Sequence, residues 1–265
     1  MPSRQRTFRV EAVILRHQDW GEADRLITLF SRERGKLRAV AKGVRKVRSR
    51  KAGHLEPFNC VSLLLAQGKD LPIITQAETQ TAYLAFQEDL LRLGHGATLL
   101  ELVDRFTVEE EANPALYSLL VETLERLNHS DDTWMDVRFF EMKLLDFVGF
   151  RPQLFQCVIC GEAIQAQDQF FSCELGGVVC PTCAVGQRSL LPASMAALKY
   201  LRHLQRSTYR EARRAKVPVA VQREMEALMQ RYLQAILERA LNAPRFLRSI
   251  AQLPGNQDES MSTCS

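Results

Sequence analysis

Residues 26–41 read Leu26-Ile27-Thr28-Leu29-Phe30-Ser31-Arg32-Glu33-Arg34-Gly35-Lys36-Leu37-Arg38-Ala39-Val40-Ala41, which is the pattern of two β-strands joined by a tight turn. The first five residues are mostly strand formers. The turn falls at Arg34-Gly35, and the residues after it alternate with a period of two, so that Leu37 and Ala39 share one face. A half-buried sheet is therefore expected in this part of the chain.

Three further strand candidates flank this pair, at residues 8–15, 58–66 and 72–77. The last two are joined by Gln67-Gly68-Lys69-Asp70, a natural hairpin connection. Five short strands between residues 8 and 77 suit a small closed barrel of the oligonucleotide-binding (OB) type.

From about residue 79 the apolar period becomes helical. Asn113-Pro114 combines a helix N-cap with proline at the first helical position. A second helix is expected from Thr133, with Asp136 at capping-box spacing, and Gly149 and Pro152 end it. Residues 194–206 and 221–241 are again helical, and the last helix carries a buried stripe of Met225, Leu228, Tyr232, Ile236 and Ala240.

The expected fold class is therefore α+β, in a chain of 265 residues. Residues 1–79 are expected to form an OB-fold nucleic-acid-binding domain with a β-barrel. Residues 80–251 are expected to form an α-helical domain with an inserted four-cysteine zinc finger at 153–188. The polar residues 252–265 are expected to be a disordered tail.

The zinc finger is predicted from two Cys-x-x-Cys pairs, Cys157 with Cys160 and Cys180 with Cys183. Their separation by residues 161–179 is typical of a tetrahedral thiolate site for Zn²⁺. Four protein ligands leave no open position for a substrate, so the metal is expected to be structural. Cys173 is a fifth thiol inside the finger and leaves the ligand set slightly open.

Other roles for these cysteines fit the sequence less well than a structural zinc site. Disulfide cysteines would suit a short, cysteine-dense secreted scaffold, whereas this chain has seven Cys in 265 residues. A zinc deaminase needs His-x-Glu with Pro-Cys-x-x-Cys. His54-Leu55-Glu56 matches the His-x-Glu part of this motif, but Gln156 rather than proline precedes the nearest Cys-x-x-Cys pair. No P-loop sequence and no nucleophile-and-base arrangement is recognisable, although catalytic groups can lie far apart in a sequence.

The charge of the chain is unevenly distributed. Residues 1–51 hold fifteen Lys and Arg against five Asp and Glu, whereas the rest is net acidic. Such an asymmetry indicates a polyanion binder, although a solvated loop is the plain alternative. The predicted nucleic-acid contacts are Arg16, Arg25, Lys36, Arg38, Lys42, Arg45, Lys46, Arg48, Arg50 and Lys51. Trp20 and Phe58 are either stacking platforms for bases or core residues.

A second basic segment covers residues 202–216, where Glu211 is the only acid. It either extends the nucleic-acid surface, receives an acidic peptide or is a solvated helix end. The candidate residues for an acidic partner are Arg202, Arg206, Arg210, Arg213 and Arg214.

Between residues 8 and 250 the sequence resembles the bacterial recombination mediator family RecO. The order and spacing of several segments together are specific, although no single segment is diagnostic. These segments are Asp24-Arg25-Leu26-Ile27-Thr28-Leu29-Phe30 with Gly35-Lys36, Ala41-Lys42-Gly43-Val44-Arg45, Leu55-Glu56-Pro57-Phe58, Leu144-Leu145-Asp146-Phe147-Val148-Gly149-Phe150-Arg151-Pro152, Cys157-Val158-Ile159-Cys160-Gly161 and Gly176-Gly177-Val178-Val179-Cys180-Pro181-Thr182-Cys183.

The resemblance implies an OB barrel followed by a helical domain with a zinc finger, and a protein without enzymatic turnover. It implies binding of single- and double-stranded DNA, annealing of complementary strands, and binding of the acidic C-terminal tail of single-stranded DNA-binding protein (SSB). It also implies cooperation with RecR in loading RecA during DNA repair. An RNA-binding or translation-associated zinc protein is the alternative.

The expected location is the bacterial cytoplasm, in association with the nucleoid. No apolar run approaches the roughly 18 residues that a membrane span needs. The N-terminal apolar run Ala12-Val13-Ile14-Leu15 is too short for a signal peptide.

Overall fold

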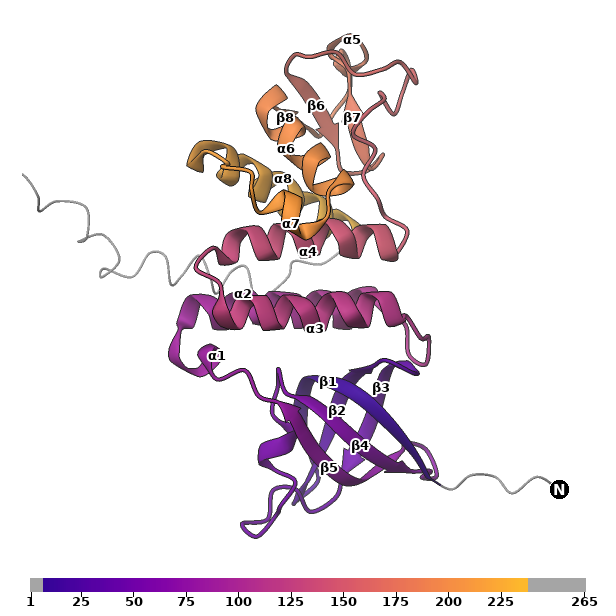
Figure 1. Ribbon diagram of the computed structural model, residues 1–265. Coiled ribbons are helices and arrows are strands. Elements are labelled where there is room, and N and C mark those ends of the chain that lie inside the picture. The colour runs from indigo at the N-terminus through magenta and orange to yellow at the C-terminus, as the bar shows by residue number, and fades with distance from the viewer. Residues whose placement is uncertain (1–6, 238–265) are drawn as a thin grey trace, which may run out of the picture. The chain divides into compact units, whose positions relative to one another are not determined.

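A computed structural model of the chain describes residues 7–237 (Figure 1). By their internal contacts these residues form two compact units, which cover 7–131 and 132–237 of the described part. Strands and helices occur in both units, so the predicted α+β class is confirmed. The predicted domain limits stay a prediction. The tail at 252–265 and Ala240 lie outside the described residues.

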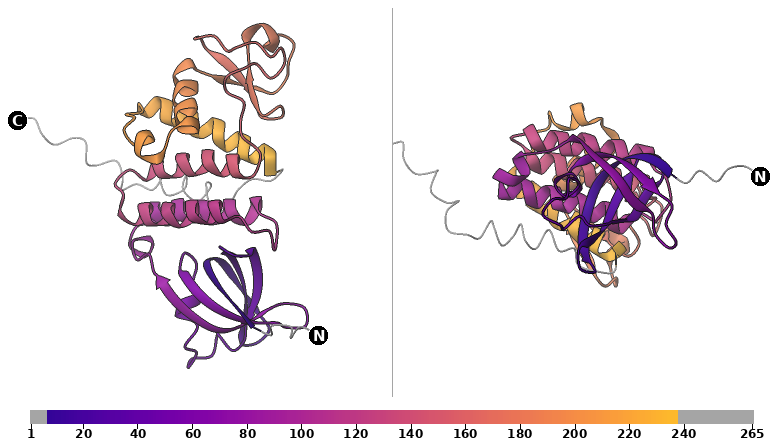
Figure 2. Two further views of the ribbon diagram at one scale, coloured as in Figure 1. Left: turned by 45° about the vertical axis from the view of Figure 1, so that its right-hand side comes forward. Right: turned by 90° about the horizontal axis from the view of Figure 1, so that it is seen from below.

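The first unit begins with a closed five-stranded barrel in the order β1-β2-β3-β5-β4. Figure 2 shows these strands from two further sides. Neighbouring strands pair antiparallel, except that β3 and β5 close the barrel in parallel, with Val40 opposite Ile73. All five predicted strands are present: β1 (Thr7–Trp20), β2 (Asp24–Ser31), β3 (Gly35–Ala41), β4 (Cys60–Ala66) and β5 (Ile73–Thr81).

Several strand limits differ from the sequence prediction. β5 continues past Ala77 to Thr81, so the helical region begins later than the predicted residue 79. β1 continues past Leu15 as far as Trp20, which pairs with Asp24 of β2. The polar residues in this extension show no apolar alternation, so the pattern does not reveal it. β4 begins at Cys60 rather than Phe58, because Phe58 adopts a positive φ of 74° that no strand allows.

The barrel interior is filled by side chains that alternate along each strand. On β3 the side chains of Leu37, Ala39 and Ala41 are buried, whereas Lys36 and Arg38 are not. Because side chains in a strand point alternately to opposite faces, this register places apolar groups inside and cations outside. The buried cluster contains Val10, Ala12, Ile14, Ile27, Leu29, Leu37, Ala39, Ala41, Val44, Leu55, Val61, Leu63, Leu65 and Ile74.

Three helices complete the first unit: α1 (Ala85–Glu88), α2 (Leu90–Phe106) and α3 (Pro114–His129). The predicted cap of α3 is confirmed, since Asn113 accepts a hydrogen bond from the Leu116 N–H and Pro114 is at the first turn. The ring of Phe58 lies against that of Phe86 at 4.8 Å between centroids. A Cβ at Gly96 of α2 would meet the Phe58 ring at 2.9 Å, so the helix approaches closely only because this residue is glycine.

The second unit combines helices with a small sheet of order β7-β6-β8. Within this unit, α4 and α8 both contact α6 (Figure 1). Its elements are α4 (Thr133–Phe147), β6 (Gln169–Ser172), β7 (Gly177–Val179), α5 (Pro181–Ala184), β8 (Leu190–Ala193), α6 (Met195–Arg206), α7 (Tyr209–Ala212) and α8 (Val219–Leu237).

Helix α4 begins where it was predicted, but with a different cap. Asp132, rather than Thr133, accepts the hydrogen bond from the Met135 N–H. Asp136 does not serve a capping box, because it is buried and accepts a hydrogen bond from the Tyr209 hydroxyl. In α8 the predicted stripe is buried at Met225, Leu228 and Tyr232, whereas Ile236 is only half-buried. No described helix is long and apolar enough to cross a membrane.

Candidate metal centre and nucleic-acid interface

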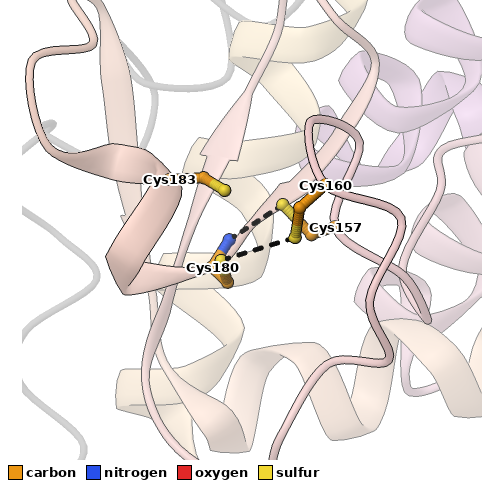
Figure 3. Close-up of side chains that lie close together, drawn as sticks. All are labelled: Cys157, Cys160, Cys180 and Cys183. Carbon is orange, nitrogen blue, oxygen red and sulfur yellow. Dashed lines mark hydrogen bonds between the residues drawn. The ribbon is translucent and has the colours of Figure 1, made fainter.

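Four cysteines converge in the second unit (Figure 3). The Sγ atoms of Cys157, Cys160, Cys180 and Cys183 all lie within 4.8 Å of one another, and those of Cys160 and Cys180 are 3.9 Å apart. A tetrahedral site with Zn–S bonds of about 2.3 Å holds its sulfurs about 3.8 Å apart. The donor set and its spacing therefore fit a tetrahedral ion that prefers thiolates.

Each pair of cysteines is positioned by its own local structure. Cys157 and Cys160 lie on the loop before β6, and the Gly161 N–H closes their turn by donating to the Cys157 carbonyl at 2.9 Å. Gly161 has a φ of +79°, which glycine adopts without strain. Cys180 is the residue before α5, and Cys183 lies within that helix. The sulfurs therefore project from two short turns.

A close backbone approach joins the first turn to the sheet. A Cβ at Gly177 of β7 would lie 2.5 Å from Val158 Cγ1 and 2.7 Å from the Gln153 carbonyl oxygen, so only glycine fits. The approach lets the Val158 N–H donate to the Val178 carbonyl at 2.9 Å. The first pair is thus attached to the strand that leads into the second pair.

The thiols of the cluster differ in acidity. Burial opposes ionisation of Cys157, but the backbone N–H groups of Cys160, Cys180 and Ile159 outweigh it and lower its pKa to about 6. Hydrogen bonds with Cys180 and Cys160 raise the pKa of Cys183 to about 12. Ionisation of all four thiols would place four negative charges close together, and a divalent cation is the group that would offset that repulsion.

In the described part of the chain, the other residues considered as metal ligands are not part of the cysteine cluster. The metal-type cluster there contains the four paired cysteines and neither Cys173 nor a histidine. His54 Nδ1 lies 2.8 Å from the Thr79 hydroxyl, and Glu56 contacts His17 and Arg25 in the barrel unit. The residues of a deaminase site are therefore not assembled around the cysteines.

The ten cations predicted for nucleic-acid binding fall into two groups. Six have partners within the first unit. Lys51 donates to the Ile74 carbonyl at 3.0 Å, and burial lowers its pKa. Five others form ion pairs, which join Arg16 and Lys36 to Asp104, Arg25 to Glu56 and Asp19, Arg38 to Glu109, and Arg45 to Asp19.

The other four cations are Lys42, Lys46, Arg48 and Arg50, and their side chains are exposed. Among residues 7–237 they form no ion pair and no side-chain hydrogen bond. They lie on residues 42–50, which follow β3 and which we call the basic loop. Their charge is therefore available to a polyanion without loss of an existing contact.

The start of the basic loop is fixed against the β1–β2 hairpin. The Gly43 N–H donates to Asp24 Oδ1 at 2.7 Å, and the Arg45 N–H donates to the Ala23 carbonyl at 3.0 Å. Because the Gly43 amide already has a partner, the cations rather than this amide are available to a phosphate. Trp20, Gly21, Glu22, Ala23, Asp24, Lys42, Gly43, Arg45 and Lys46 line a hollow of about 860 Å³ between hairpin and loop.

A second hollow, of about 850 Å³, lies in the second unit. Arg206 stacks over the Phe155 ring at 3.7 Å, and Arg202 lies over the same ring at 5.4 Å. Of the predicted partner residues, Arg202, Arg206 and Arg214 line the hollow, whereas Arg210 and Arg213 do not. The remaining lining residues are Phe155, Lys199, Tyr200, His203, Glu211 and Ala215.

Phe155 and Tyr200 of this hollow were not singled out from the sequence. The usable signal was the spacing of Arg202 and Arg206, four residues apart on α6, which places both guanidinium groups on one helix face. Phe155, which lies under these two arginines, belongs to a separate loop. The arginine spacing therefore does not predict which residue packs there.

Comparisons with known proteins agree with this architecture. A family model described as "Recombination protein O N terminal" matches residues 5–83, and one described as "Recombination protein O C terminal" matches residues 87–245. The two matches meet close to the end of the barrel.

Relatives with a curated name are similar over most of their length. A protein of Roseiflexus sp. (strain RS-1) named "DNA repair protein RecO" is 40% identical over 226 residues, which is 85% of this chain and 80% of the relative. A protein of the same name from Dehalococcoides mccartyi (strain ATCC BAA-2266 / KCTC 15142 / 195) is 34% identical over 83% of this chain and 86% of its own length.

Proposed function

The chain belongs to the RecO family of DNA repair proteins, and from this we propose that it is a non-enzymatic mediator of recombination. In this proposal it binds single- and double-stranded DNA and anneals complementary strands. Together with RecR it helps load RecA onto single strands coated with SSB. It acts in the bacterial cytoplasm, at the nucleoid.

The observation that carries the proposal is the basic loop, with four exposed cations on an OB-type barrel that have no ion pair within the described part of the chain. OB barrels commonly bind single strands through their loops. Lysine and arginine contacts to phosphates release counterions and do not depend on base sequence. Sequence-independent binding is what a repair protein requires, and neutralised phosphates also reduce the repulsion between two strands that anneal.

The test is the salt dependence of single-stranded DNA binding for the wild type and for a variant with Lys42, Lys46, Arg48 and Arg50 all changed to Glu. If the four cations each neutralise one phosphate, the log–log slope of affinity against salt is about −2.8 for the wild type. The variant should lose binding and most of the slope.

A control variant changes a similar cation elsewhere. Arg223 on α8 is exposed, and it forms no ion pair among residues 7–237. Arg223→Glu should leave affinity and slope unchanged. Equal binding by the wild type and the fourfold variant, or no binding by the wild type at low salt, would refute the role of the basic loop.

The hollow around Phe155 is proposed as the site for the acidic tail of SSB. Its apolar floor and its cationic rim of Arg206, Arg214 and Lys199 suit a peptide that combines apolar and acidic side chains. Charge reversal of Arg206 and Arg214 should weaken binding of such a peptide at least tenfold. Reversal of Arg210 and Arg213 is the matched control, because these arginines lie outside the hollow. An equal effect of the two double variants would contradict the placement.

The four cysteines are proposed to hold a structural Zn²⁺. Their geometry fits the ion, and with all four ligands from the protein no coordination position remains for chemistry. The alternative of an RNA-binding zinc protein is not favoured by the family. Competition between RNA and DNA of one sequence tests it directly, and a preference for RNA would support the alternative.

A further inference from the structure

Trp20 is the large apolar side chain that the barrel leaves outside its core at the β1–β2 hairpin. It is 47% exposed, it ends β1, and among the described residues its ring contacts no other aromatic ring and no cation. Single exposed apolar residues are common and need no explanation by themselves. The position of Trp20 is informative because of what surrounds it.

Trp20 lines the hollow of about 860 Å³ together with Lys42 and Lys46, two of the four unpaired cations. This volume falls in the range of roughly 300–1,000 Å³ typical of sites for small ligands. The hollow therefore places an aromatic side chain beside Lys42 and Lys46, which form no ion pair among residues 7–237. Glu22 and Asp24 also line it, and Asp24 is engaged by the Gly43 N–H. A flat apolar ring attached to a phosphate matches the aromatic side chain and the two lysines.

Phe58, the other aromatic candidate of the barrel, is not available for such a role. Its half-buried ring packs against Phe86 and lies close to Gly96, so its ring face is already occupied within the first unit. Of the two platforms considered from sequence, Trp20 is the one that faces open space.

We propose that the hollow binds one unpaired nucleotide of a single strand, with the base stacked on Trp20 and its flanking phosphates held by Lys42 and Lys46. The inference rests on the proposed DNA-binding function and adds the reason for a preference. Phosphate contacts do not distinguish single from double strands, whereas a base can stack on a side chain only when it is unpaired. Trp20 is thus proposed as the residue that makes the barrel favour single-stranded DNA.

The first test distinguishes a contact with the base from a contact with the phosphates. The chain has two tryptophans, so Trp134→Phe leaves Trp20 as the single tryptophan, whose fluorescence is excited selectively above the tyrosine absorption. This protein is titrated with a dT oligonucleotide, with an abasic oligonucleotide of the same length and with duplex DNA. We expect quenching of Trp20 by dT, and little quenching by the abasic strand or the duplex.

Affinity gives the second readout. Trp20→Ala should weaken dT binding about five- to 150-fold, as expected for loss of one stacked base, and should leave abasic and duplex affinities unchanged. Trp20→Phe should recover most of the loss. Val47→Ala is the control, because Val47 is a fully exposed apolar residue of the basic loop that does not line the hollow.

The outcomes distinguish the two proposals. If the wild type binds neither dT nor duplex DNA, both the proposed DNA-binding function and the proposed stacking on Trp20 are refuted. If the wild type binds dT but the Trp20→Ala variant binds it equally well, only the proposed stacking on Trp20 is refuted. An equal loss on dT, abasic and duplex DNA also overturns it, because that pattern indicates a structural role for Trp20.

Discussion

The Sγ atoms of Cys160 and Cys180 lie 3.9 Å apart although 20 positions separate the residues in the chain. The β6–β7 pairing, with Ser172 opposite Gly177, returns the chain to the first pair of cysteines. Backbone hydrogen bonds therefore bring the thiols together, but they do not remove the repulsion between thiolates. The ion is expected to supply that part of the stability.

Removal of one ligand should release the metal. Cys157→Ser and Cys180→Ser should lose stoichiometric zinc and destabilise the second unit, since structural zinc sites contribute apparent binding free energies of roughly 10–16 kcal/mol. Zinc content by mass spectrometry and thermal unfolding measure both effects. Cys173→Ser is the control and should keep its zinc. Stoichiometric zinc in both ligand variants would disprove the assignment.

Glycine at position 96 should be required for stability of the first unit. A Cβ there lies 2.9 Å from the Phe58 ring and 3.2 Å from that of Phe86. Gly96→Ala should cost about 1–3 kcal/mol through overpacking, in spite of the better helix propensity of alanine. Urea unfolding measures the loss. Gly53→Ala, where nothing lies within 4 Å, should be close to neutral.

Freeing Arg38 from its ion pair with Glu109 should strengthen DNA binding if DNA contacts the barrel face as well as the basic loop. Arg38 Nε lies 2.6 Å from Glu109 Oε1. Glu109→Gln removes this exposed ion pair at little cost in stability. The single-strand affinity should rise and the salt slope should steepen by up to about 0.7. An unchanged slope would place Arg38 outside the DNA contact.

Glu141 should make stability depend on pH. Burial raises its pKa to about 7, although Arg138 lies 3.0 Å away and opposes the shift, and Glu226 adds to it. Because the folded-state pKa exceeds the ordinary value of 4.5, the stabilising contribution is complete below pH 4.5 and is lost as pH rises through 7. The effect is at most roughly 3 kcal/mol.

The measurement compares the free energy of unfolding of wild type and Glu141→Gln between pH 5 and 8. Relative to the wild type, the variant should gain stability as pH rises. A constant difference across this range would show that Glu141 stays ionised beside Arg138.

Much of this architecture was predictable because it depends on local pattern. The alternation at Leu37, Ala39 and Ala41 specifies a strand and its inner face, and Asn113-Pro114 specifies a helix start. Cysteine spacing predicted which four thiols converge. These features involve residues that are close in sequence or that share a strict period.

What the sequence did not reveal depends on contacts between distant segments. Arg16 and Lys36 look as available as Lys42 in the sequence, but Asp104 of α2 lies beside them in the fold. Charge runs therefore overestimate the free cations of the barrel. The extension of β1 to Trp20 is likewise set by pairing with β2 and not by apolar residues of its own.

The barrel is closed between β3 and β5 by the pair Val40 and Ile73, with the Val40 N–H donating to the Pro72 carbonyl at 2.8 Å. The Lys51 ammonium reaches across to the Ile74 carbonyl of the same strand. Lys51 follows directly on the basic loop, so the loop leads to the seam between β3 and β5. If bound DNA stabilises the folded barrel, opening of this seam should become rarer, and hydrogen exchange at the Val40 amide should slow as DNA is added.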